Sequence, residues 1–112
     1  MQDIGIINFS YNWNKKLDCN CFTTIRLENY NKYKTGLSYQ IHLKNEFIKV
    51  GKIVEIKVFP LRSLNEFISR LDTGYSKEET IKIINRMYPQ TLYNIETSFM
   101  LILIETVKEP TI

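Results

Sequence analysis

The spacing of the apolar residues changes twice along this chain of 112 residues, and this change constrains the fold more than any other feature. Up to Phe59, apolar residues often recur at every second position, as in strands with one buried face. Between Ser63 and Met87 they recur at every third or fourth position, as in amphipathic helices. Phe99–Ile104 is then a continuous apolar run, typical of a strand buried on both faces. Strands, a helix pair and a closing strand, in this order, predict an α+β fold.

The expected strands are short runs rich in β-branched and aromatic residues and bounded by turn formers. They lie at residues 4–9, 22–27, 38–43, two within 47–59 that turn near Val50-Gly51, and 98–107. A brief helical turn is expected within 10–18, and an exposed loop closed by Gly36 within 28–35. We therefore expect a single domain over residues 1–112, a small mixed or antiparallel β-barrel of five or six strands with two helices inserted before the last strand.

Two serines mark the expected helix starts. Ser63 and Ser76 each stand three residues before a glutamate, which is the capping-box pattern. The second helix should end at Tyr88-Pro89, because proline does not continue a helix, and Gly74 should supply the positive φ of the link between the helices. The side chains expected to be buried are Leu64, Phe67, Ile68 and Leu71 in the first helix and Ile81, Ile84 and Met87 in the second.

The strand at 22–27 carries the residues with the clearest chemical potential. Thr24 and Arg26 are two apart, so their side chains share one face of the strand. This places a hydroxyl beside the planar guanidinium, which can bind a phosphate, a carboxylate or the carbonyl edge of a base with two parallel hydrogen bonds. Thr24 and Arg26 are therefore the first candidate ligand contacts.

The basic residues are concentrated in the first half of the chain. Residues 1–62 contain ten Lys or Arg and five Asp or Glu, which is compatible with an RNA or nucleotide-like ligand. In the expected loop, Lys32 and Lys34 are candidates for contacts with phosphates. Tyr30, Tyr33 and Tyr39 are candidates for stacking on bases, a common way of reading RNA.

Metal, cofactor and membrane functions have little support in the sequence. Cys19 and Cys21 lie too close for an ordinary disulfide, and His42, the single histidine, lies in another expected strand, so we expect reduced thiols, no metal site and no cofactor. No signal peptide is visible, and the longest apolar run, Phe99–Ile104, is too short to cross a bilayer. We expect a soluble cytoplasmic protein without a membrane partner.

Several short motifs follow one another along almost the whole chain, from about residue 4 to residue 107. They are Thr24 and Arg26, Lys34-Thr35-Gly36, the turn from Asp72 to Ser76, the helix end Ile81-Ile84-Tyr88-Pro89, and the strand Phe99–Ile104. Their order and spacing resemble the ASCH domain, a branch of the PUA-like superfamily. The resemblance implies a β-barrel with a cleft between the barrel and the helices, and a ligand that is RNA or a modified nucleoside.

The same resemblance suggests candidate catalytic residues. A bacterial subgroup of the family hydrolyses the amide of N4-acetylcytidine with a lysine, a threonine and a glutamate. Thr24 matches the threonine, Asp72 or Thr73 lies where the glutamate is expected, and Cys21 stands at the lysine position. Lys16 or Cys21 would have to replace that lysine, because a threonine hydroxyl is a poor nucleophile without a neighbouring base.

Three functions remain open from the sequence. We favour a domain that binds RNA or a nucleotide-like ligand around Thr24 and Arg26, because the replaced lysine makes Thr24 a ligand contact rather than a nucleophile. The alternatives are an amidohydrolase acting on a modified nucleoside and a non-catalytic protein-interaction domain in which Arg26 is tied to the Asp72 turn. An open cleft where Arg26, Thr24 and a carboxylate converge would favour ligand binding, and a closed core around Arg26 would favour protein interaction.

Overall fold

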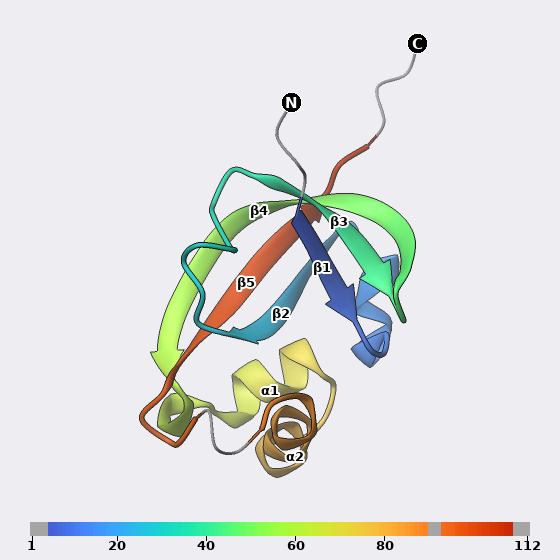
Figure 1. Cartoon of the computed structure of the whole chain (residues 1–112). Coiled ribbons are helices and arrows are strands. Elements are labelled where there is room, and N and C mark those ends of the chain that lie inside the picture. The colour runs from blue at the N-terminus through green and yellow to red at the C-terminus, as the bar shows by residue number, and fades with distance from the viewer. Residues whose placement is uncertain (1–4, 90–92, 109–112) are drawn as a thin grey trace.

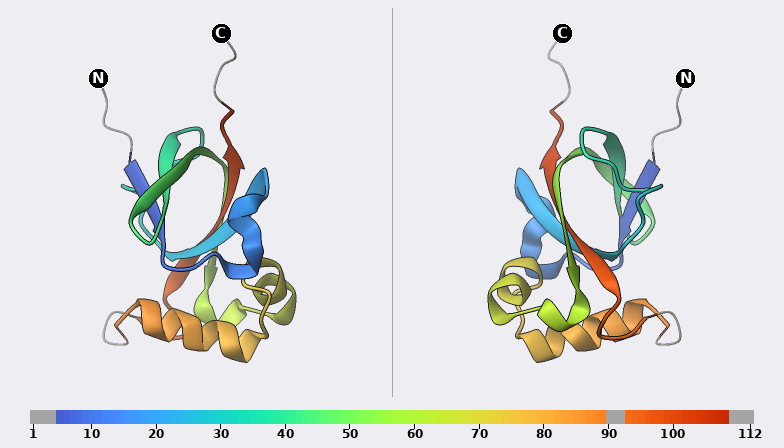
Figure 2. Two further views of the ribbon diagram at one scale, coloured as in Figure 1. Left: turned by 90° about the vertical axis from the view of Figure 1, so that its right-hand side faces the viewer. Right: turned by 90° about the vertical axis from the view of Figure 1, so that its left-hand side faces the viewer.

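Five strands form one mixed sheet in the computed structural model, which describes residues 5–89 and 93–108 (Figure 1). The strands are β1 (Gly5–Phe9), β2 (Cys21–Leu27), β3 (Ser38–Leu43), β4 (Glu46–Pro60) and β5 (Ser98–Thr106), in the spatial order β1-β3-β4-β5-β2. The β1 and β3 strands are parallel, and the other three pairs are antiparallel. The sheet curls into a half-barrel whose edge strands β1 and β2 are not paired with each other, as Figure 2 shows. The predicted α+β class and the barrel-like curvature of the sheet are confirmed.

The expected turn near Val50-Gly51 is wrong, since β4 is one long bent strand. Gly51 lies within this strand, paired with Tyr39 on β3 and Thr106 on β5. A Cβ on Gly51 would lie 2.5 Å from Ile104 Cγ2, so the glycine permits close packing of two strands rather than a chain reversal. A register shift between Ile53 and Glu55 adds to the bend that closes the sheet.

The helical segments lie in two places. The 3₁₀ segment η1 (Trp13–Asp18) precedes β2, whereas η2 (Leu61–Ser63), α1 (Glu66–Asp72) and α2 (Lys77–Met87) lie between β4 and β5, where two helices were expected. Ser76 caps α2 as predicted, by accepting a hydrogen bond from the backbone N–H of Glu79. The prediction for α1 is partly wrong, because Asn65 rather than Ser63 is its cap. Neither helix in the described ranges is long and apolar enough to cross a bilayer.

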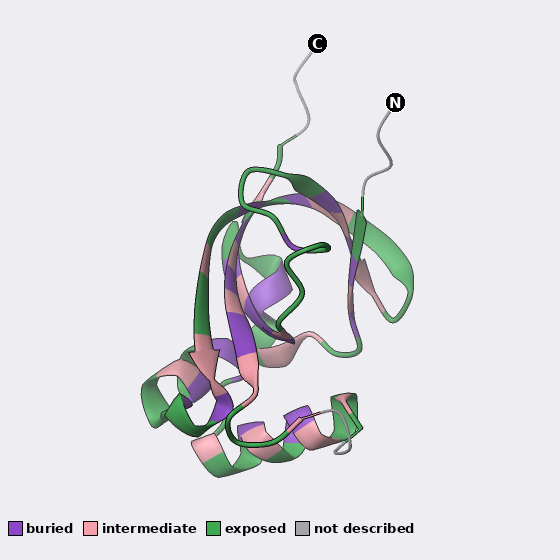
Figure 3. Cartoon of the chain, turned by 60° about the vertical axis from the view of Figure 1, so that its left-hand side comes forward, coloured by how far each residue is buried: buried purple, intermediate pink, exposed green. Residues whose placement is uncertain are grey.

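Two apolar clusters hold the structure together, and Figure 3 shows where buried residues lie along the strands and helices. One cluster fills the half-barrel around Ile7, Ile41, Ile53, Met100, Ile102 and Ile104. The other joins the end of the sheet to the helices through Ile25, Leu61, Leu64, Ile84 and Phe99. Phe67 and Leu71, expected in the core, are 74% and 61% exposed, because the short helix α1 turns its Ser69 and Asp72 side inward. The two clusters leave a polar junction between the half-barrel and the helices.

Candidate functional site

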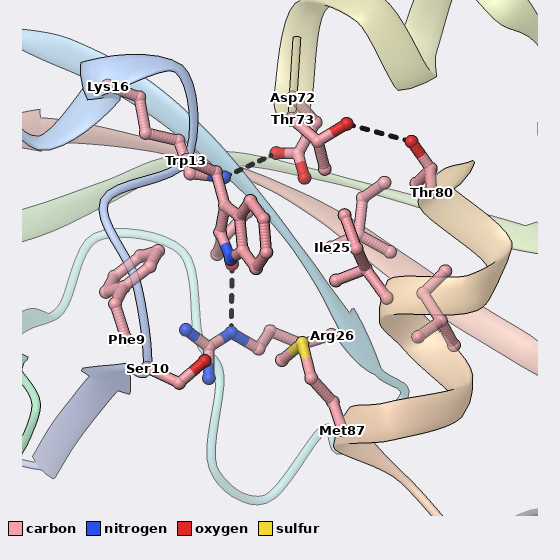
Figure 4. Close-up of a pocket in the computed structure, with 13 residues that line it drawn as sticks. Phe9, Ser10, Trp13, Lys16, Ile25, Arg26, Asp72, Thr73, Thr80 and Met87 are labelled. Atoms are coloured by element: carbon pink, nitrogen blue, oxygen red, sulfur yellow. Dashed lines mark hydrogen bonds and ion pairs between the residues drawn. The ribbon is translucent and has the colours of Figure 1, made fainter. Parts of the chain in front are cut away.

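A small cavity lies at this junction, and its walls come from β1, η1, β2, α1 and α2 (Figure 4). This inner cavity has a volume of about 20 Å³, enough for roughly one water molecule. Lys16, Arg26 and Asp72 contribute charged groups to its lining, Thr24 contributes a hydroxyl, and Phe9, Trp13, Ile25, Ile83, Ile84 and Met87 contribute apolar surface. The structure thus brings together four of the candidate residues that the sequence indicated, Lys16, Thr24, Arg26 and Asp72.

Arg26 is held inside the half-barrel rather than on an open strand face. The predicted shared face of Arg26 and Thr24 is confirmed, since Arg26 Nε donates a hydrogen bond of 2.9 Å to Thr24 Oγ1. The guanidinium also lies over the ring of Phe9, with its Cζ 4.7 Å from the ring centroid. Arg26 is only 8% exposed, and among the described residues no carboxylate forms an ion pair with it. The surroundings of Arg26 are therefore nearly closed, as expected for a structural role, and not the open cleft that was expected for ligand binding. The guanidinium has no counter-charge, however, so it can still serve an anionic or acceptor-rich ligand.

Lys16 and Asp72, which also line the inner cavity, form a buried ion pair. Lys16 Nζ lies 3.0 Å from Asp72 Oδ1, and the same oxygen accepts a 2.7 Å hydrogen bond from Thr23 Oγ1. Loss of hydration lowers the pKa of Lys16, Asp72 opposes this effect, and the charge of Arg26 lowers the pKa further. Among the described residues, none donates a hydrogen bond to the other carboxylate oxygen, Oδ2. Asp72 therefore keeps acceptor capacity for a ligand.

Local backbone conformation explains why Lys16, and not its neighbour, reaches the cavity. Asn14 and Lys15 both have left-handed backbones, with φ of 57° and 53°, and this reversal leaves Lys15 exposed and Lys16 buried. The turn after α1 packs against the same segment, because a Cβ on Gly74 would lie 3.1 Å from Asn14 Cγ. Such sparsely populated conformations persist only where the surrounding structure enforces them. Sequence patterns carry no signal for this reversal.

Asp72 owes its position to hydrogen bonds between the two helices. Thr73 Oγ1 lies 2.8 Å from Thr80 Oγ1 on α2, and it also donates to the carbonyl of Ser69 on α1. Thr73, Thr80 and Ser69 are all buried. Thr73 is thus engaged in joining α1 to α2, and Asp72 is the carboxylate that the turn presents to the cavity.

A wider outer cavity adjoins the inner one. It has a volume of about 390 Å³ and is lined by Asn8, Ser10, Trp13, Ile83, Arg86 and Met87. Ser10, Trp13, Ile83 and Met87 line both cavities, so these side chains form the boundary between them. Sequence reasoning missed Trp13 and Met87 as site residues. The available signal was that Trp13 is the single tryptophan of the chain and precedes the lysine-containing turn.

The other candidate residues lie at different places. Cys21 is exposed at the start of β2 and is not among the residues that line the inner cavity. Lys32 and Lys34 are exposed on the loop after β2, as expected, and Lys32 is close enough to Arg26 that the Arg26 charge, after desolvation, lowers the pKa of Lys32. Three tyrosines were expected to offer free rings: Tyr30 is 59% exposed, but Tyr33 and Tyr39 are only 7% and 3% exposed.

The buried Tyr39 ring has a structural role, and the buried Tyr33 ring lies near Arg26. The Tyr39 hydroxyl donates to the carbonyl of Lys32 and accepts from the N–H of Lys34, so it holds the loop against the half-barrel. Burial raises the pKa of Tyr33, and the nearby Arg26 charge partly opposes that shift. The expectation of exposed stacking rings at both positions is therefore wrong.

The fold and the site together define a small α+β half-barrel with a polar cavity at its helical end. A solved structure with this fold is that of protein EF3133 from Enterococcus faecalis V583, of the DUF984 family. The two structures superpose with a TM-score of 0.73 at 11% sequence identity, over 96% of this chain and 78% of that chain. No protein-family model and no curated protein matches the sequence. At this identity the likeness shows the fold alone.

Proposed function

We propose that this protein is an ASCH-type, PUA-like domain that binds a nucleoside-like ligand, free or as one nucleotide of an RNA, in the inner cavity. The observation that carries the proposal is the burial of Arg26 without a carboxylate partner among the described residues. Lys16 is buried as well, so the cavity has two cations and only one carboxylate, Asp72. This excess of donors matches the ring acceptors of a nucleobase better than it matches an apolar ligand.

A cytosine ring has complementary groups for this cavity. Its O2 and N3 atoms accept hydrogen bonds, which the guanidinium of Arg26 can donate, and its N4 amino group can donate to Asp72. Trp13 lies beside the cavity and supplies a surface on which a planar ring can stack. Because the inner cavity holds only about one water, Met87 and Trp13 must move outward to admit a ring. Met87 is flexible and 38% exposed, which allows this movement.

Fluorescence of Trp13 provides a direct test, because it is the only tryptophan and it lines the cavity. We expect cytidine to change the Trp13 emission in a saturable way. Uridine should bind at least about tenfold more weakly, because its O4 would face Asp72 with an acceptor in place of a donor. A short RNA with a terminal cytidine tests whether the base is accepted within a polymer.

The matched variants are Arg26→Gln and Arg62→Gln. Loss of a charged donor from the cavity should weaken cytidine binding by about 10- to 100-fold. Arg62 is exposed and paired with Glu96, so its replacement should leave the affinity unchanged. Equal affinity of wild type and Arg26→Gln, or no response to nucleosides or RNA, would refute the proposal.

Amide hydrolysis is a second candidate, favoured by the position of Lys16. The amine of Lys16 is buried, its pKa is lowered, and it lines the same cavity as Thr24 and Asp72. The cavity therefore has the lysine, hydroxyl and carboxylate that the resemblance to the amidohydrolase subgroup calls for. A desolvated lysine can act as the base that removes a proton from a nucleophilic hydroxyl. In this arrangement the hydroxyl of Thr24 attacks the amide carbonyl, and Arg26 holds the nucleobase of the substrate.

N4-acetylcytidine is the substrate that tests this candidate. Incubation with wild type should release cytidine and acetate, measured by chromatography. Thr24→Val keeps the shape but removes the hydroxyl, so it should reduce turnover by at least about a hundredfold. Cys21→Ser, on the exposed residue, should remain active. Full activity of Thr24→Val would exclude Thr24 as the nucleophile, and unchanged substrate at high protein concentration would exclude hydrolysis of this amide.

A further inference from the structure

The outer cavity has a charge that the proposed base-binding site does not use. Arg86, in the last turn of α2, is the only charged residue among the six that line it. Asn8 and Ser10 add neutral polar groups to the same lining. Arg86 is exposed, and among the described residues no carboxylate pairs with it. The described part of the outer cavity's lining is therefore basic and contains no acidic residue.

The two cavities share part of their lining, and each has a cation in it. Ser10, Trp13, Ile83 and Met87 border both, so outward movement of Trp13 and Met87 would open the inner cavity toward the outer one. Arg26 lines the inner cavity and Arg86 lines the outer one. The inner volume of about 20 Å³ admits a ring only after Met87 and Trp13 move outward, whereas the outer volume of about 390 Å³ has room for a bulkier, hydrated group.

We propose that Arg86 forms a phosphate subsite, so that the preferred ligand is a nucleoside phosphate rather than a bare nucleoside. This inference rests on the proposed function, since it places the base in the inner cavity and the sugar phosphate in the outer one. The planar guanidinium can donate two parallel hydrogen bonds to phosphate oxygens. Asn8 and Ser10, which line the same cavity, can donate further hydrogen bonds.

Titration of Trp13 fluorescence with cytidine and with cytidine 5′-monophosphate tests the subsite. In wild type the monophosphate should bind about five- to tenfold more tightly than cytidine. This affinity ratio should fall as the salt concentration rises, because the ion pair between Arg86 and the phosphate is exposed to solvent. Arg86→Gln should bring the ratio to about one without changing the affinity for cytidine. The control Lys82→Gln, on an exposed lysine of the same helix that lines neither cavity, should keep the wild-type ratio.

Each alternative result has a definite meaning. Equal affinities for cytidine and its monophosphate in wild type, or a preference that survives Arg86→Gln, overturn the phosphate subsite while nucleoside binding stands. Inorganic phosphate that displaces the monophosphate at similar concentrations shows an anion site independent of the base, and it also overturns the inference. Absence of any response to both nucleosides overturns the proposed function itself.

Discussion

Asp72→Ala is expected to lower the free energy of unfolding at neutral pH by about 3–5 kcal/mol, because it leaves a buried lysine without its counter-charge. Lys16 and Asp72 are 6% and 4% exposed, and they lie 3.0 Å apart, so solvent screens neither charge. Urea denaturation followed by circular dichroism measures the change. A loss of this size is a large fraction of the stability of a small domain.

Two controls separate the ion pair from the packing around it. The double variant Lys16→Met with Asp72→Ala removes both charges, so it should recover most of the lost stability. Glu96→Ala breaks an exposed pair with Arg62, and its effect should stay below about 1 kcal/mol. If Asp72→Ala and the double variant are equally destabilised, the loss comes from packing and hydrogen bonds, and our account of the pair is wrong.

The pH dependence of the same variants follows from the direction of the Lys16 shift. Burial lowers the pKa of Lys16 below its ordinary value of 10.5, so in the interval between the folded and unfolded pKa the unfolded chain binds more protons. The Lys16 contribution to stability therefore rises with pH through this interval and is complete above the unfolded pKa. Asp72→Ala removes the attraction that opposes the shift, so the interval widens toward lower pH.

Unfolding free energies compared at about pH 7 and about pH 9 test whether the Lys16 contribution to stability rises with pH. Relative to the double variant, Asp72→Ala should gain stability as the pH rises. A constant difference between the two proteins would show that Lys16 stays protonated in the folded state of Asp72→Ala over this interval, because its amine escapes to solvent.

The sequence was sufficient for the elements whose pattern is local. The apolar spacing located β1, β2, β3 and β5 closely, and the serine cap and Gly74 located the start of α2 and the link before it. It failed at β4, where Gly51 was interpreted as a turn residue. A glycine required for close strand packing and a glycine in a turn look alike in a single sequence, because only the neighbouring strands distinguish them.

The site shows the same division between local and tertiary information. Thr24 and Arg26 were predictable, because two residues two apart on one strand necessarily share a face. The position of Lys16 was not, since it depends on left-handed backbones at Asn14 and Lys15, neither of which is glycine. The proximity of Lys16 to Asp72, 56 positions later in the chain, is set by the packing of η1 against the turn after α1.

The burial of Arg26 is compatible with ligand binding and with a purely structural role, and one substitution distinguishes them. If the guanidinium serves a ligand, the free protein keeps a desolvated charge that weakens its own fold, as binding sites often do. Arg26→Met retains the length and apolar stem of the side chain but removes the charge. We expect this variant to unfold at higher denaturant concentration, with a gain of about 1–4 kcal/mol, and to lose nucleoside binding altogether.

The opposite signs of these two effects make the experiment decisive. Arg62→Met, at an exposed arginine, should change the free energy of unfolding by less than about 0.5 kcal/mol and should leave the affinity for nucleosides unchanged. If Arg26→Met is instead destabilised by more than about 1 kcal/mol, its bond to Thr24 and its contact with Phe9 outweigh the desolvation of the charge. Arg26 would then be a structural residue, and a protein-interaction domain would fit this chain better than a nucleoside-binding one.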